Sequence, residues 1–231
     1  LNEELLAFLL NISPSSVSRI FSTWIILISK EMAAFIHWPT LQEIQNHGVP
    51  NCFNKWKRLR SIIDCFEIVT EKPSLAEANS ALYSAYKSRP TSKFLISITP
   101  GGTVSFVSKG AGGNMSDKEI VLKSGFLEKF DYYDQCIADK GFRVTGEFLE
   151  VGVELILPPF AVTGRQFSSK ESHPNRDLAH ARIHVERVIG RVRDFQILKG
   201  PIPVTLLDLI SPIVNVCCIL TNIMQSVVSE A

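Results

Sequence analysis

Hydrophobic residues recur along the chain at two spacings, one typical of helices and one typical of strands. Within residues 1–35 the spacing is helical, and Ser13 before Pro14 is typical of a helix start. The residues that share one face at i, i+3, i+4 and i+7 are Val17, Ile20, Phe21 and Trp24. The pattern predicts a helix over 14–28 that packs through these four residues on a shorter helix over 3–10.

The predicted second helix carries small polar residues away from its apolar face. They are Ser15, Ser16, Ser18 and Arg19. Two helices with such an exposed surface have the outline of a helix-turn-helix, whose second helix enters a DNA groove. Two packed helices of an ordinary core have the same pattern, and the pattern alone does not choose between them.

From residue 57 onward the pattern alternates between strands and helices. The predicted strands are 59–69, 93–99, 103–108, 136–139 and 153–157. Pro100-Gly101-Gly102 predicts a hairpin turn, and Ser116 with Glu119 forms a capping box that begins a helix. A polar, flexible stretch from Thr163 to Arg176 precedes a long helix predicted over 178–195.

This order of elements predicts an α/β fold, a mixed sheet with helices on both faces. We expect a helix-turn-helix segment at 1–35, a linker at 36–56 and the α/β domain at 57–231. The apolar tract 201–228 is interrupted by polar residues and Pro212, so it predicts a buried helix and no membrane contact.

Composition narrows the function classes. Of 231 residues 45% are hydrophobic and 20% charged, which excludes a disordered chain. The formal net charge is +1, so any DNA-binding surface has to be a local patch. Five cysteines without a C-x-x-C spacing favour a reducing compartment over a disulfide framework or a zinc site. The start at Leu1 suggests an intracellular fragment, with an N-terminal module missing.

Three carboxylates stand where ordinary packing does not call for them. Asp64 interrupts the apolar strand 59–69, and Asp139 ends a short one. Glu186 lies at the margin of an apolar helical stripe, between Arg182 and Arg193. For either aspartate alone, the pattern favours an ordinary structural role, with Asp64 as a strand-edge residue and Asp139 as a helix cap or turn former. For Glu186, a solvated Arg-Glu-Arg ladder and a metal ligand both remain open.

Six segments in order resemble the DDE-superfamily endonucleases of PIF/Harbinger-type transposons. They are SIIDCFEI at 61–68, FLISITPGG at 94–102, VSKGAGG at 107–113, SDK at 116–118, IADKGF at 137–142 and ARIHVERVIG at 181–190. Gly110 departs from the bulky residue expected there in relatives. Residues 1–30 are similar to the helix-turn-helix that precedes the nuclease domain in that family.

The resemblance implies an RNase H-like fold and a catalytic, metal-binding triad of Asp64, Asp139 and Glu186. It implies two Mg²⁺ (or Mn²⁺) ions and a transposase that cleaves and joins transposon-end DNA by phosphoryl transfer. Expected partners are the transposon ends, the target DNA, further copies of the chain and a separate DNA-binding protein or N-terminal module. Such a protein would work in the nucleus.

Basic residues on and after the Glu186 helix extend this interpretation. Arg182, Arg187 and Arg193 are expected near DNA phosphates. With Arg191 and Lys199 they form a cationic cluster, some of whose members should border the acids and contact the DNA backbone, with ion pairing on the helix surface as the alternative. A second function remains open: a domesticated derivative that binds DNA or recruits a partner without cleaving.

Overall fold

The β-branched run at 59–69 forms the central strand of a mixed sheet. The computed structural model of the chain describes residues 3–47, 49–158 and 169–225. The strands are β1 (Leu59–Val69), β2 (Tyr83–Ser84), β3 (Arg89–Ile98), β4 (Val104–Val107), β5 (Ala111–Gly112), β6 (Gln135–Ile137) and β7 (Glu154–Ile156). The α-helices are α1 (Glu3–Leu10), α2 (Pro14–Glu31), α3 (Leu41–Asn46), α4 (Ala76–Leu82), α5 (Asp117–Lys123), α6 (Thr145–Glu150), α7 (Ser169–Arg193) and α8 (Ile210–Ile223). Short 3₁₀ helices are η1 (Ala33–Phe35), η2 (Asn51–Phe53), η3 (Leu127–Lys129), η4 (Gln196–Leu198) and η5 (Val204–Leu209).

Strand β1 has an antiparallel neighbour on one side and a parallel neighbour on the other. Its Ile62 pairs with Ile98 of antiparallel β3 and with Ile137 of parallel β6. Strand β7 continues the sheet parallel to β6, while β2, β4 and β5 pair with the outer edge of β3. This is the predicted mixed α/β sheet of the RNase H-like kind, and the prediction is confirmed.

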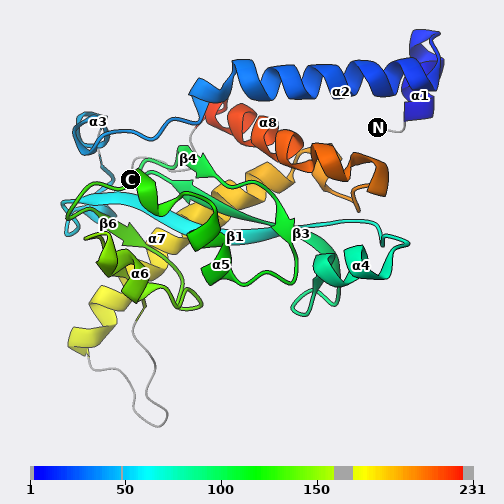
Figure 1. Cartoon of the computed structure of the whole chain (residues 1–231). Coiled ribbons are helices and arrows are strands. Elements are labelled where there is room, and N and C mark those ends of the chain that lie inside the picture. The colour runs from blue at the N-terminus through cyan, green and yellow to red at the C-terminus, as the bar shows by residue number, and fades with distance from the viewer. Residues whose placement is uncertain (1–2, 48, 159–168, 226–231) are drawn as a thin grey trace.

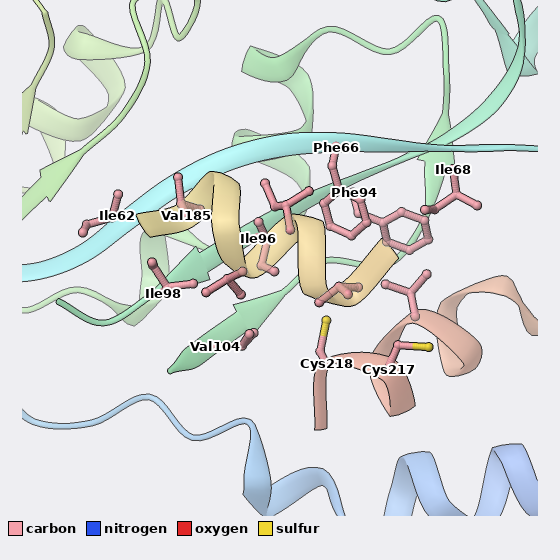
Figure 2. Packing of buried hydrophobic residues seen from close by; sticks show 14 of the residues in the cluster. Ile62, Phe66, Ile68, Phe94, Ile96, Ile98, Val104, Val185, Cys217 and Cys218 are labelled. Carbon is pink, nitrogen blue, oxygen red and sulfur yellow. The ribbon is translucent and has the colours of Figure 1, made fainter. Parts of the chain in front are cut away.

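The two faces of the sheet are covered by different helices. One face carries Ile62, Phe66, Ile68 and residues of β3, packed against α7 and α8. Figure 2 shows Val185 of α7 with Cys217 and Cys218 of α8 closing over these side chains. The opposite face carries Ile63 and Leu95, packed against α5 and α6. Because successive side chains of a strand point to opposite faces, the same strands supply apolar residues to both cores.

The N-terminal helices join the molecule through α8, which lies between α2 and the sheet (Figure 1). Phe21 and Ile25 of α2 pack against the core, and the Asn215 side chain donates to the Ser29 hydroxyl at 2.8 Å. The segment Val204–Ile223 is long and apolar enough to cross a membrane, as is the bent pair α1–α2. In this fold the α-helical part of the predicted tract 201–228 is α8, whose inner side is buried in the core, while residues 226–228 lie outside the described residues. The division into three regions stays a prediction.

The structure corrects the predicted packing of the second helix. Val17 is buried and Phe21 half-buried, but Ile20 is 48% exposed and Trp24 56% exposed. Helix α2 turns Phe21 and Ile25 toward α8, and this rotation leaves Ile20 and Trp24 on the outer side. Of the predicted polar surface, Ser15 and Arg19 are exposed, whereas Ser16 and Ser18 are half-buried.

The long helix begins earlier than predicted. Helix α7 starts at Ser169, so residues 169–176 of the predicted flexible stretch are helical. Residues 163–168 lie outside the described residues. The polar composition hides this extension, as does Pro174, which removes one backbone N–H from the helix but lies near its start. Strand β5, at 111–112, also lies where 110–114 predicted only a loop.

Asn222 ties three segments together, and its removal should destabilise the fold. Its side-chain amide donates to the carbonyls of Val104 and Phe35 and accepts from the Val104 N–H, each at 2.8 Å. Asn222→Ala leaves these backbone groups without their partner and should lower the free energy of unfolding by about 1–3 kcal/mol.

Urea unfolding measures this loss. Asn54→Ala is the matched control, because the side chain of exposed Asn54 donates to Asn51, three residues earlier in the same turn, and joins no distant segments of the described chain. Equal losses in the two variants would contradict the assignment of Asn222 as a tertiary link.

Candidate active site

Asp64 is placed by the alternation of β1 on the face that packs against α7. It stands between Ile62 and Phe66, which are both buried in that core. The Asp64 side chain is half-buried, and its Oδ1 accepts a hydrogen bond from the Cys65 N–H at 2.8 Å. A carboxylate therefore interrupts an otherwise apolar face, in the middle of the central strand.

Parallel pairing brings Asp139 next to Asp64. Ile62 and Ile137 are direct partners, and each aspartate follows its isoleucine by two residues. Neighbouring strands lie about 4.8 Å apart, and the two carboxylates are near enough for their charges to interact. Asp139 lies just beyond the end of β6, where its Oδ1 accepts from the Lys140 N–H at 2.6 Å.

Glu186 reaches the same place from helix α7. Val185, Val188 and Ile189 of this helix are buried against the sheet, while Glu186 is exposed at the edge of the contact. One turn earlier, Arg182 contacts both acids. Its Nη2 lies 3.2 Å from Glu186 Oε1 and 3.1 Å from Asp139 Oδ2. One guanidinium thus joins carboxylates that are 47 residues apart in the chain.

The three carboxylates share one electrostatic environment. Burial is the largest cause that raises the pKa of Asp64, to about 6, from its ordinary value of 3.8. The negative charges of Asp139 and Glu186 raise it further, whereas the Cys65 N–H and the Arg182 guanidinium lower it. The pKa of Asp64 therefore depends on the charges of Asp139, Glu186 and Arg182, as expected for groups in one cluster.

The chemistry of these groups fits a hard divalent cation. Among the described His, Cys, Asp and Glu residues, no three lie close enough together to hold a metal ion as they stand. The Arg182 guanidinium contacts two of the candidate acids, so one positive charge offsets part of their negative charge. Carboxylate oxygens without nitrogen or sulfur donors favour Mg²⁺ or Mn²⁺ over Zn²⁺. The residues that could contribute such oxygens here are Asp64, Asp139 and Glu186.

The other predicted site residues are distributed differently. Arg187 is exposed on α7, and Arg193 donates to the Glu67 carbonyl at 3.4 Å at the end of that helix. The N-terminal candidates Ser15, Ser16, Ser18 and Arg19 lie on α2, on the far side of α8 (Figure 1). The structure does not bring them to the carboxylates.

Sequence reasoning missed the contact of Arg182 with Asp139. The i, i+4 spacing indicates the pair with Glu186, and the structure contains it. The pair with Asp139 depends on how α7 crosses the end of β6, and no local pattern carries that information. Arg182 also remains a predicted phosphate contact.

Comparison with known families matches most of this region. A family model described as DDE superfamily endonuclease matches residues 63–222. The match covers the three carboxylates and all strands except the first residues of β1. No curated protein and no solved structure matches the chain.

The raised pKa of Asp64 predicts a pH-dependent stability in metal-free buffer. Below pH 3.8 this carboxyl is protonated in both the folded and the unfolded chain, and above about 6 it is ionised in both. Between these values the folded state binds more protons, so stability falls as the pH rises. Asp64→Asn removes this loss and should be more stable above pH 6, by on the order of 1–3 kcal/mol.

Urea unfolding in EDTA at pH 4, 5, 6 and 7.5 tests the prediction. The difference between Asp64→Asn and the unsubstituted chain should grow between pH 4 and 6 and then stay level. Asp194→Asn is the control, since that carboxylate is exposed just after α7. A difference that is constant over the whole range would contradict the placement of Asp64.

Proposed function

Because the chain belongs to the DDE superfamily endonucleases, we propose that it is a metal-dependent DNA transposase of the PIF/Harbinger type. Its substrates would be transposon ends and a target DNA, which it would cleave and join in the nucleus. The observation that carries this proposal is the convergence of Asp139 and Glu186 on one guanidinium, with Asp64 in the same electrostatic field. A soluble α/β domain with structural acids has no need for that arrangement.

Asp64, Asp139 and Glu186 act in this proposal as the ligands of two Mg²⁺ or Mn²⁺ ions. When bound, the ions supply an activated water or 3′-hydroxyl and stabilise the leaving oxygen of a phosphodiester. The fold of the protein sets the positions of these three ligands. Asp64 is fixed by the central strand, Asp139 by the parallel pairing of β6, and Glu186 by the packing of α7 on the sheet.

Arg182 has two tasks in the proposed reaction. Without a metal it holds the acids of two separate elements and offsets their repulsion. The side chains involved are 31–54% exposed, so each ion pair contributes about 1 kcal/mol or less and is readily exchanged. Once released, the same guanidinium is a donor for a phosphate oxygen of the DNA beside the site.

A second candidate function, recruitment of a partner protein, is favoured by the N-terminal helices. Helices α1 and α2 expose large apolar side chains, among them Phe8 at 81%, Leu9 at 65% and Trp24 at 56%. Exposed apolar surface on neighbouring helices is more typical of protein contacts than of a DNA groove. A separate DNA-binding protein or another copy of the chain would then provide end recognition.

Loss of one metal ligand should separate cleavage from binding. Asp139→Asn keeps the shape of the side chain but removes its charge, so Mg²⁺-dependent cleavage should fall below detection. Binding of the same DNA in EDTA should change little, because a carboxylate does not contact the phosphates. The assay uses duplex DNA carrying the terminal repeats of the element, with Asp194→Asn as control.

Two results would contradict the proposal. Cleavage by Asp139→Asn at the rate of the unsubstituted chain would show that this carboxylate holds no essential ion. Metal-independent cleavage by the unsubstituted chain would show that none of the three carboxylates holds an essential ion.

The N-terminal helices give a separate prediction. If α2 reads DNA, Arg19→Ala should lower DNA affinity and reduce the slope of log affinity against log salt by about one unit. Trp24→Ser should leave DNA binding unchanged. If α2 recruits a protein, only Trp24→Ser should change the behaviour of the chain, as a shift in its mass in light scattering.

A further inference from the structure

A cleft opens where α7 ends beside the central strand. It encloses about 340 Å³ and is bordered by β1, by the turn between β2 and β3 and by the segment after η4. The charged residues that line it are Glu67, Lys87, Arg89, Arg193 and Lys199. Neither Lys87 nor Arg89 was among the residues expected to bind DNA.

The charge in this cleft is strongly positive. The lining contains four cations and one carboxylate. That carboxylate belongs to Glu67, whose side chain has partners outside the cleft. Its side chain accepts from the Thr91 hydroxyl at 2.8 Å and lies 3.8 Å from Lys93 Nζ. Within the described ranges, neither Arg89 nor Lys199 pairs with a carboxylate. In a chain of net charge +1, so local an excess of cations favours an anionic ligand.

Two of the cations that line the cleft are held in position by neighbouring groups. The Arg193 guanidinium lies over the Phe66 ring, 5.7 Å from its centroid, and donates to the Glu67 carbonyl at 3.4 Å. On the opposite wall, Lys87 Nζ lies 4.5 Å from the centroid of the Tyr86 ring. Positioned cations lose less freedom when a phosphate binds.

The cleft lies beyond the candidate active site along both β1 and α7. Arg193 is near enough to Asp64 for their charges to interact. It follows Glu186 by seven helical residues, or roughly 10 Å at about 1.5 Å each. Glu67 follows Asp64 by three strand residues, again roughly 10 Å at about 3.3 Å each. Along both β1 and α7, the cleft therefore lies roughly 10 Å from the acids.

We propose that this cleft binds a backbone phosphate of the DNA about three nucleotides from the bond that is cut. The inference rests on the proposed function for the position of that bond. One strand of duplex DNA advances about 3.4 Å per nucleotide, so a separation of roughly 10 Å corresponds to three nucleotides. Arg193 and Lys199 form one wall, and Lys87 and Arg89 form the other.

A binding experiment in EDTA tests the cleft without any cleavage. Lys87→Gln combined with Arg89→Gln should weaken duplex binding and reduce the salt slope by about two units, one per cation. The matched control is Lys123→Gln combined with Lys129→Gln, which removes two exposed cations from the opposite face of the sheet. Thermal unfolding checks that both variants fold. Equal slopes for the cleft and control variants would overturn the proposal.

A neutral methylphosphonate, placed at one phosphate at a time, locates the contact. On one side of the scissile bond, the substitution near the third phosphate should weaken binding by the unsubstituted chain but not by the Lys87, Arg89 double variant. Equal sensitivity of both proteins at every position would overturn the assignment. Competition by inorganic phosphate as effective as that by DNA would show a site for free anions and overturn it as well.

These readouts separate the cleft from the catalytic proposal. If Asp139→Asn abolishes cleavage but the cleft variant binds DNA normally, only the cleft assignment fails. If the cleft variant loses binding although the unsubstituted chain cuts no DNA, the cleft stands as a DNA contact and the catalytic proposal fails.

Discussion

The arrangement of the candidate active site depends on how three carboxylates are accommodated at an otherwise apolar face of the sheet. Asp64 stands between buried Ile62 and Phe66, where ionisation is costly. Asp139 and Glu186 add like charge nearby, so a cation at this place would stabilise the folded state with all three acids ionised. Arg182 meets this requirement in part, because its guanidinium reaches two of the acids but only influences the third.

The fold brings these groups together by long-range pairing. The acids come from a central strand, the end of its parallel neighbour and a helix far along the chain. Their convergence needs the sheet register and the contact of α7 with the sheet, and α8 closes that contact from outside (Figure 1). Asn215 and Asn222 then tie α8 to α2 and to β4. Remote substitutions can therefore alter the geometry of the acids.

Local features of the fold were predictable from the sequence, and tertiary ones were not. The β-branched run of β1, the hairpin at 100–102 and the capping box at Ser116 are encoded by neighbouring residues. The placement of Asp64, Asp139 and Glu186 followed from resemblance. The exposure of Ile20 and Trp24 and the contact of Arg182 with Asp139 depend on how helices meet distant elements, and no spacing along the chain records that.

Separation of charge in space explains why the net charge of this chain says little about its function. Acids that attract metal ions also repel DNA, so a nuclease site needs cations within reach of the flanking phosphates. Arg182 lies among the acids, and Arg193 lines a basic cleft farther along the same helix. The formal net charge of the whole chain is only +1, although the acids and the basic cleft each concentrate one sign of charge. Function at such a site therefore has to be argued from the positions of charges rather than from their sum.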